Sequence, residues 1–131
     1  MQKVNFFILG APKCGTTAMV DYLGQHPEIF IPYIKEPNYF CDDFPHIRKY
    51  TDLDEYLAIF PFAETKYQVF GDATVWNLYS QTAVPNIVRY NPDAKFLAMI
   101  RRPQEMLPSL HSQLIFSNWE EIASFEEAWS A

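Results

Sequence analysis

The chain has 131 residues, of which 49% are hydrophobic and 17% aromatic, and its formal net charge is −6 at pH 7. This length supports one compact core, and the apolar content is that of a globular protein rather than a disordered one. We therefore expect a single domain over residues 1–131. An acidic chain offers no broad basic surface to nucleic acid or an anionic membrane, so an anionic ligand would need local binding groups.

Cysteine usage and hydropathy favour the cytoplasm. Cys14 and Cys41 form no CxxC pair, and we interpret both as reduced thiols rather than as a disulfide or zinc ligands. No apolar run reaches the about 18 residues that a membrane helix needs. Met1 leads almost directly into a strand-like segment, without the features of a signal peptide. The sequence thus predicts a cytoplasmic protein, and it carries no signal of oligomeric state.

Hydrophobic periodicity predicts a strand and a helix at the start of the chain. Residues 4–10, VNFFILG, form an apolar run that ends in glycine, as a buried parallel strand does. Apolar residues at helical spacing predict a helix over 16–25. Residues 28–33 are expected to be a short extended piece. Residues 34–50 are rich in proline, aspartate and aromatic residues, which is typical of a loop.

The alternation of strands and helices continues through the rest of the chain. Asp52 is a candidate N-cap with acidic residues in the turn that follows it. Pro85 must either start a helix or kink one. The remaining predicted elements are a helix over 52–60, a strand over 67–74, a helix over 77–90, a strand over 94–101, a helix over 103–117 and the opening of an amphipathic helix near Phe125.

This order of elements indicates βαβ units, and hence an α/β fold with a mostly parallel central sheet flanked by helices. In such sheets ligands bind beyond the carboxyl ends of the strands. The loop after Gly10, the turn at 71–74 and the residues after Met99 all follow strands, so they should lie along one edge. We expect the functional site at that edge.

The first of these segments, GAPKCGTT at residues 10–17, has the features of an anion-binding loop. Its two bracketing glycines allow a sharp turn that brings backbone N–H groups close to an anion. The helix that follows adds its unpaired N–H groups and the positive end of its dipole. Thr16 and Thr17 add hydroxyl groups, and Lys13 adds a positive charge. A plain strand-to-helix turn with a threonine cap is the alternative.

The position of the lysine argues against a kinase or nucleoside triphosphatase. The two glycines have the spacing of a Walker loop, but Thr16 stands where the Walker lysine would be, and Lys13 lies inside the loop. The strand over 94–101 runs into arginines and not into a Walker B aspartate. Phosphoryl transfer relies on Mg²⁺ and that lysine to neutralise dense negative charge. A sulfuryl group carries less charge, so lysines and backbone amides could transfer it without a metal.

Four segments together resemble the sulfotransferases that use 3′-phosphoadenosine-5′-phosphosulfate. GAPKCGTT resembles their 5′-phosphosulfate loop. The segment AKFLAMIRRPQEMLPSLHSQL, with Arg101 followed eight residues later by Ser109, resembles their 3′-phosphate segment. IKEPNYF (34–40) and GDATVWNLY (71–79) resemble the Lys-Glu-Pro-aromatic and Gly-acid-x-Thr-Pro segments of the branch that acts on carbohydrates and related hydroxyls.

The resemblance implies a P-loop-like, three-layer fold and a metal-independent transfer of a sulfuryl group to the hydroxyl of a carbohydrate or small molecule. The second product would be 3′,5′-adenosine bisphosphate. Glu36 would be the general base, with Lys13 and Lys35 as the other catalytic residues. The implied donor-binding residues are Ala11, Pro12, Lys13, Cys14, Gly15, Thr16, Thr17, Arg101 and Ser109, and the implied acceptor-binding residues are Asp72, Thr74 and Trp76.

Several of these residues also have plainer interpretations. Glu36 and its neighbouring lysine could be a solvated loop pair, and Arg101 a surface charge at a strand end. His46 and His111 could each be the base, but we interpret both as ordinary polar residues. Pro108 would remove a backbone hydrogen bond inside a helix, unless the helix began there. The aromatic residues that could line an acceptor pocket, or else belong to the core, are Tyr33, Tyr39, Phe40 and Trp76.

The glycine-rich, basic C-terminal segment of that family has no counterpart in these residues. We therefore expect the N-terminal portion of the fold, incomplete at its C-terminal end, and an activity that could be slow or absent. A nucleotide-binding remnant without catalysis is thus one alternative function. A P-loop kinase or nucleoside triphosphatase is the other.

Overall fold

A four-stranded sheet forms the centre of the molecule in the computed structural model, which describes residues 2–33 and 36–131. The spatial order of its strands is β2-β3-β1-β4, and every pairing is parallel. This confirms the predicted α/β fold with a parallel sheet. The strands are β1 (Phe6–Gly10), β2 (Ile29–Phe30), β3 (Val69–Ala73) and β4 (Lys95–Ala98).

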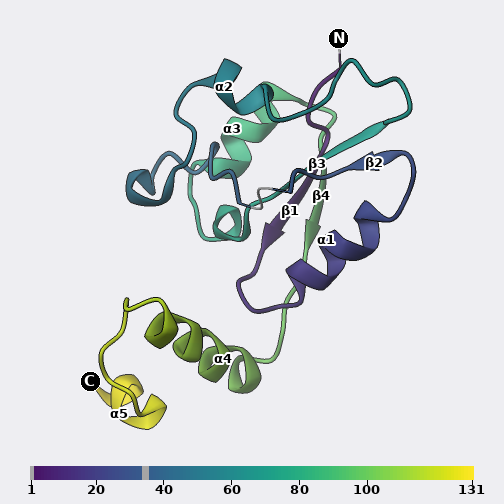
Figure 1. Cartoon of the computed structure of the whole chain (residues 1–131). Coiled ribbons are helices and arrows are strands. Elements are labelled where there is room, and N and C mark those ends of the chain that lie inside the picture. The colour runs from purple at the N-terminus through teal and green to yellow at the C-terminus, as the bar shows by residue number, and fades with distance from the viewer. Residues whose placement is uncertain (1, 34–35) are drawn as a thin grey trace.

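Helices lie on both sides of this sheet. Figure 1 shows α1 on one side and α2 with α3 on the other. Two short 3₁₀ helices, η1 and η2, interrupt the connections. The helical elements are α1 (Thr16–Gly24), η1 (Pro45–Ile47), α2 (Leu53–Leu57), η2 (Val75–Leu78), α3 (Ala83–Tyr90), α4 (Pro103–Phe116) and α5 (Phe125–Ser130).

Local sequence explains where several helices begin. The Asp52 side chain accepts a hydrogen bond from the backbone N–H of Glu55 at 3.0 Å and so caps α2. The helix expected over 77–90 is divided, because η2 ends at Leu78 and α3 begins at Ala83. Pro85 therefore lies in the first turn of α3, where backbone N–H groups have no partner within the helix and the missing donor costs little.

The main core lies between the sheet and helices α2 and α3. Phe7 and Leu9 of β1 belong to it, together with Tyr56 of α2 and Ile87 of α3. Phe7 is 0% exposed, and its ring meets the edge of the Phe40 ring at 5.6 Å between centroids. Because alternate side chains of a strand point to opposite faces, Ile8 is directed to the other side of the sheet, and it is also fully buried. A strand buried on both faces explains the unbroken apolar run of the sequence.

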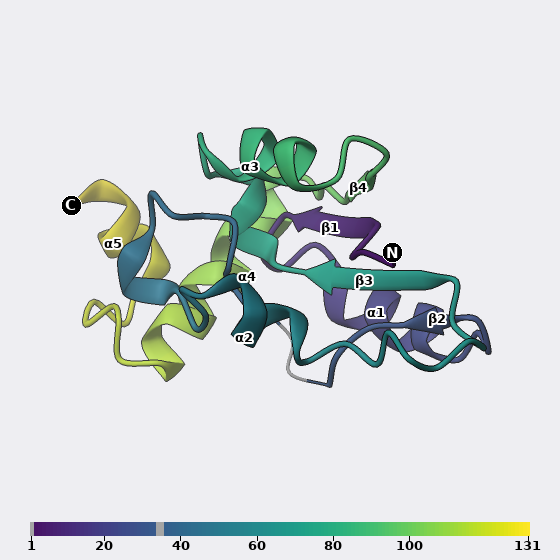
Figure 2. The same ribbon diagram turned by 90° about the horizontal axis from the view of Figure 1, so that it is seen from above.

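Helices α4 and α5 lie beyond the carboxyl ends of the strands, away from the main core (Figure 2). None of residues 95–131 is buried. Pro108 lies inside α4, which begins five residues earlier at Pro103, so the helix does not start at Pro108. Within the described part of the chain, no helix is both long and apolar enough to cross a bilayer.

Candidate active site

The loop between β1 and α1 is held at both of its ends. The N–H of Ala11 donates to the carbonyl oxygen of Met99 at 2.7 Å, and the N–H of Met99 donates to that of Gly10 at 2.8 Å. At the other end Gly15 is the N-cap of α1, with a left-handed backbone at φ 81°. Lys13 is also left-handed, at φ 59°. The loop therefore holds an uncommon backbone shape directly before the N-terminus of a helix.

Gly10 is required where the loop leaves the strand. Its φ is +150°, which side chains rarely allow. A Cβ atom at this position would lie 2.5 Å from the carbonyl oxygen of Val75 and 3.0 Å from Cβ of Leu78. The loop and η2 thus approach each other across a space that only glycine leaves open.

Glu36 lies on a second segment, which is hydrogen-bonded to the carboxyl end of β3. Its N–H donates to the carbonyl oxygen of Ala73 at 3.2 Å, and the N–H of Asn38 donates to Oγ1 of Thr74 at 3.2 Å. Glu36 and Asn38 are left-handed, at φ 63° and 54°. A left-handed backbone costs about 1–2 kcal/mol per residue for side chains other than glycine. The bonds to β3 and its extension offset that cost and set the position of Glu36.

The buried carboxylate of Asp72 holds this segment in place through Thr74. Asp72 is 1% exposed and accepts hydrogen bonds from the hydroxyl groups of Tyr56 and Thr74, both at 2.7 Å. Burial raises the pKa of Asp72, the two hydroxyl groups oppose that shift, and the negative charge of Glu36 adds to it. Thr74 links Asp72 to the Glu36 segment, because the same Oγ1 that donates to Asp72 accepts a hydrogen bond from the N–H of Asn38.

The third part of the site follows β4. Nη1 of Arg101 donates to the carbonyl oxygen of Lys13 at 3.2 Å, which attaches the arginine to the loop. Nε of Arg101 also lies 3.6 Å from a carboxylate oxygen of Glu105 on α4, and Arg102 pairs with the same glutamate. Ser109 lies two turns into α4. The strand end, the loop and α4 are thereby brought together.

These three parts surround one cavity of about 630 Å³, which we call the loop cavity. A cavity of this size can hold a nucleotide-sized ligand. Lys13 and Arg101 supply positive charge to its wall, and Asp21 and Glu36 supply negative charge. The described residues that line it are Pro12, Lys13, Gly15, Thr16, Thr17, Ala18, Asp21, Glu36, Val75, Trp76, Arg101, Ser109, Leu110, Gln113 and Leu114.

Most of the residues predicted from the sequence lie on that wall, but four do not. Ala11 and Cys14 are buried at 6% and 8% exposure, and the Cys14 thiol donates to the carbonyl oxygen of Pro12 at 3.4 Å. Asp72 and Thr74 are interior residues that hold the Glu36 segment and do not reach the wall. We therefore reinterpret Asp72 and Thr74 as positioning residues and not as acceptor contacts. Lys35 lies outside the described residues.

A second cavity, of about 430 Å³, adjoins the first, and we call it the aromatic cavity. Glu36, Trp76, Gln113 and Leu114 line both. The rest of its described lining is Asn38, Phe44, His46, Ile47, Ser117 and Trp119.

His46 and Trp119 of the aromatic cavity were missed at the level of the sequence. His46 had been interpreted as an ordinary polar residue. The two residues are 73 positions apart, and no motif connects them, so only the fold brings their rings to 6.5 Å between centroids. The other histidine that we considered, His111, has its Nε2 2.8 Å from the carbonyl oxygen of Ile122 and supports the connection to α5.

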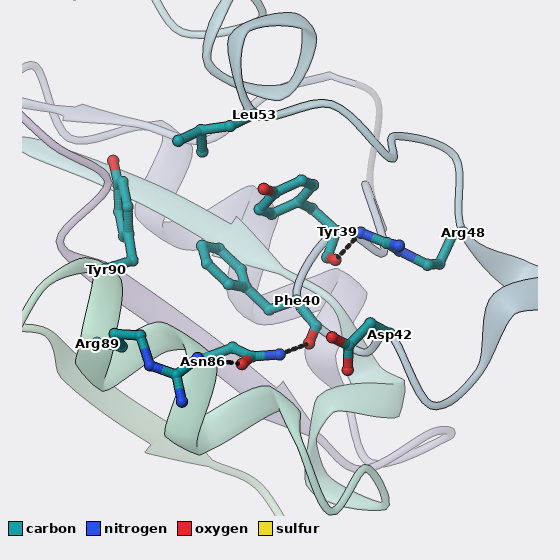
Figure 3. Close-up of a pocket in the computed structure, with 8 residues that line it drawn as sticks. All are labelled: Tyr39, Phe40, Asp42, Arg48, Leu53, Asn86, Arg89 and Tyr90. Atoms are coloured by element: carbon teal, nitrogen blue, oxygen red, sulfur yellow. Dashed lines mark hydrogen bonds between the residues drawn. The ribbon is translucent and has the colours of Figure 1, made fainter.

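A third hollow, of about 310 Å³, lies over the core between α2 and α3 and shares no lining residue with the other two (Figure 3). Its polar side chains hold the backbone around it. Arg48 donates to the carbonyl oxygen of Tyr39 at 2.8 Å, and Asn86 donates to that of Phe40 at 3.1 Å. Across the described residues, no group of three or more His, Cys, Asp or Glu side chains is arranged to hold a metal ion.

Comparison with known proteins gives consistent similarities. The chain is 26% identical over 155 aligned positions to carbohydrate sulfotransferase 15 of Rattus norvegicus, with 87% of this chain and 28% of the relative covered. It is 28% identical to the membrane-associated sulfotransferase kil1 of Dictyostelium discoideum, over 77% of this chain and 21% of the relative. A crystal structure of a sulfotransferase from Alicyclobacillus acidocaldarius superimposes with a TM-score of 0.84 at 32% identity.

The chain spans about a quarter of the length of the curated relatives that it matches. It covers 56% of the Alicyclobacillus chain, and that structure covers 97% of this one. No protein-family model matches the sequence. The similarity therefore extends over nearly all of this chain, including the loop, the Glu36 segment and α4.

Proposed function

Because the chain is similar to sulfotransferases over most of its length, we propose that it transfers a sulfuryl group from 3′-phosphoadenosine-5′-phosphosulfate to an acceptor hydroxyl. The observation that carries the proposal is the arrangement of Lys13, Arg101 and Glu36 around the loop cavity. The donor carries two anionic ends, and the acceptor hydroxyl has a proton to lose. The two cationic side chains and the Glu36 carboxylate around the same cavity match these needs.

The loop is suited to the phosphosulfate end. The N-terminus of a helix attracts an anion through its first backbone N–H groups and through the positive end of the helix dipole. Thr16 and Thr17 are at the first turn, and both line the cavity. Lys13 adds a positive charge from within the loop. The left-handed turn at Gly15 sets the direction in which these groups face.

Arg101 and Ser109 are suited to the 3′-phosphate. A guanidinium group can donate two parallel hydrogen bonds to a phosphate, and such charge-assisted pairs are strong and directional. The bond from Arg101 to the carbonyl oxygen of Lys13 fixes the arginine relative to the loop. Glu105 competes for the same guanidinium, at 3.6 Å from its Nε. Binding of a phosphate to Arg101 would therefore replace its exposed ion pair with Glu105.

In this proposal Glu36 acts as the general base. It takes the proton of the acceptor hydroxyl as the oxygen of that hydroxyl bonds to sulfur. The bound donor supplies the sulfuryl group, and the electron pair of its broken sulfur–oxygen bond stays with the departing bisphosphate. Lys13 neutralises the charge that develops on that oxygen. Glu36 then releases its proton to water, and all atoms and charges are accounted for.

Calorimetric titration separates this function from its alternatives. We expect 3′,5′-adenosine bisphosphate to bind in the absence of Mg²⁺ and more tightly than ATP does. Tighter binding of ATP with Mg²⁺ would favour a kinase or nucleoside triphosphatase and overturn the proposal. Binding of the bisphosphate with no transfer to any hydroxyl acceptor would identify a nucleotide-binding remnant.

Two variants test the assigned roles. Arg101→Ala should weaken the bisphosphate about 10- to 100-fold, since a hydrogen bond to a charged group contributes about 1.5–3 kcal/mol. Binding of adenosine 5′-phosphosulfate, which lacks the 3′-phosphate, should be almost unchanged. Arg102→Ala is the matched control, because Arg102 also pairs with Glu105 but does not line the loop cavity. Equal losses in both variants would exclude the role given to Arg101.

Glu36→Gln should lower the transfer rate about 10²- to 10⁴-fold, as loss of a general base does. The affinity for the bisphosphate should remain close to that of the wild type. A large loss of that affinity would show that Glu36 has a structural role instead.

A further inference from the structure

We propose that the acceptor is an uncharged ring compound that carries a hydroxyl group and stacks on Trp119 in the aromatic cavity. An anionic glycan would be disfavoured there. This inference rests on the proposed sulfuryl transfer and names the class of acceptor for it. Its basis is the position, the lining and the charge of the aromatic cavity.

The position of the cavity makes it the place from which a hydroxyl can reach Glu36. Glu36 lines both cavities, and so do Trp76, Gln113 and Leu114. A ligand in the aromatic cavity is therefore separated from the loop cavity only by the residues common to the two. An acceptor bound on this side would present its hydroxyl to the carboxylate that faces the donor.

Aromatic rings dominate the lining. Phe44, His46, Trp76 and Trp119 contribute rings, and Ile47 and Leu114 contribute aliphatic surface. The ring of His46 lies 6.4 Å from that of Phe44 and 6.5 Å from that of Trp119, so the three form a continuous surface. Flat apolar faces, such as a phenol ring or the C–H face of a sugar, stack on surfaces of this kind. The 68% exposure of Trp119 leaves its ring open to a ligand.

The charge of the lining disfavours anions. Among the described residues of the aromatic cavity, none is a lysine or arginine, and Glu36 adds a negative charge. A uronate or sulfate group placed here would meet that carboxylate without a cation on the described wall to compensate. Such juxtaposition of like charges is a common way to reject a wrong ligand.

Asn38 favours a hydroxyl group for a related reason. Its Nδ2 donates to the carbonyl oxygen of Ile47 at 2.9 Å, which fixes the orientation of the amide. Its Oδ1 is buried and has no hydrogen-bond partner within the described ranges. An amide oxygen can only accept hydrogen bonds, so a hydroxyl group is a suitable partner for it and a carboxylate is not.

The test uses calorimetry to measure the binding of probe compounds to the protein saturated with 3′,5′-adenosine bisphosphate. The probes are 2-naphthol, cellobiose and the uronate counterpart of cellobiose, which has the same rings and one carboxylate. We expect at least one neutral probe to bind about 10-fold more tightly than the uronate. The first two probes distinguish an aryl acceptor from a sugar acceptor.

Two tryptophans provide matched variants. Trp119→Ala should weaken the neutral probe about 3- to 10-fold, which is the range that aromatic stacking contributes, and Trp119→Phe should retain most of the affinity. Trp129→Ala is the control, because Trp129 is 69% exposed but does not line the aromatic cavity. Glu36→Gln should reduce the preference for the neutral probe, because it removes the negative charge.

The outcomes separate this inference from the proposed function. If the bisphosphate fails to bind, the proposed function is wrong. If the bisphosphate binds but the uronate binds as well as or better than both neutral probes, or if the effects of Trp119→Ala and Trp129→Ala are equal, the acceptor class is wrong and the proposed function stands.

Discussion

The two walls of the loop cavity are fixed to the molecule in different ways. The wall made by the loop and the Glu36 segment stands on buried residues, among them Thr16 at 4% exposure and Asp72 at 1%. The wall made by α4 has none, since no residue from 95 to 131 is buried. A hydrogen bond from Arg101, in the segment between β4 and α4, links this wall to the loop.

This difference indicates a division of labour in the site. Preorganised donors and a fixed base require a rigid support, because small displacements of catalytic groups cost much of the rate. The buried network of Tyr56, Asp72 and Thr74 supplies that support for Glu36. A wall with few buried contacts opens at a lower free energy than the core does. We therefore expect a ligand to order α4 more than it orders the loop.

The largest contrast between the two regions is expected from a pair of phenylalanines. Phe7→Ala removes a fully buried ring and should lower the free energy of unfolding by about 3–5 kcal/mol. Phe116→Ala, at the end of α4, truncates a side chain that is 89% exposed and should change it by less than about 0.5 kcal/mol. Urea denaturation of both variants measures the contrast. Similar losses would mean that α4 is packed as firmly as the core.

A pair of glycines tests the rigid wall itself. Gly10→Ala should lower the free energy of unfolding by about 2–4 kcal/mol. The added Cβ would lie 2.5 Å from the carbonyl oxygen of Val75, so the backbone of the loop would have to move. The substitution should also weaken the bisphosphate. Gly24→Ala, at the end of α1, has no heavy atom within 4 Å of the added Cβ and should be neutral or stabilising by up to about 1 kcal/mol. Thermal and calorimetric measurements on the two variants decide whether the approach of η2 to the loop is needed.

The smallest expected effect is the pH dependence of the buried carboxylate. Burial raises the pKa of Asp72 in the folded state above its ordinary value of 3.8. The folded state then binds the proton of Asp72 more tightly than the unfolded state does. The resulting contribution of Asp72 to the free energy of unfolding is complete below pH 3.8 and is lost as the pH rises through the folded pKa. The Asp72→Asn variant should therefore gain stability relative to the wild type as the pH rises over that window. Denaturation of both proteins at pH values from 3 to 7 measures this change.

A second variant serves as the control for this pH dependence. Tyr56→Phe removes a hydroxyl that lowers the pKa of Asp72, so the loss of stability should extend to higher pH. If the difference in unfolding free energy between Asp72→Asn and the wild type stayed constant across this pH range, Asp72 would not titrate as proposed.

Much of the fold could be predicted because it depends on local patterns. The apolar run before Gly10, the N-cap at Asp52 and the helix that begins at Pro103 are each encoded in a few consecutive residues. The division of the expected helix at 77–90 was not predicted: η2 ends at Leu78 and lies close to Gly10, a residue far from it in the sequence. The single domain over residues 1–131 and the cytoplasmic location remain predictions.

The candidate site was predictable to the extent that its residues lie in consecutive motifs. Lys13, Arg101 and Ser109 follow strand ends, and parallel strands bring such ends to one edge. Asp72 lies near the carboxyl end of β3 and Thr74 directly follows the strand, but their burial could not be read from spacing, since it depends on tertiary contacts such as that of Tyr56 with Asp72. Their change from expected acceptor contacts to positioning residues is a result of tertiary packing.

The sequence by itself determined the parallel sheet, the glycine-bracketed loop between β1 and α1 and the family to which the chain is similar, because periodicity and short motifs are properties of neighbouring residues. Only the tertiary structure decided that Glu36 borders two cavities and that His46 and Trp119 share the second one. The described residues that line the second cavity are up to 83 positions apart in the sequence, from Glu36 to Trp119. Contacts over such separations arise from the packing of whole elements, which no local pattern specifies.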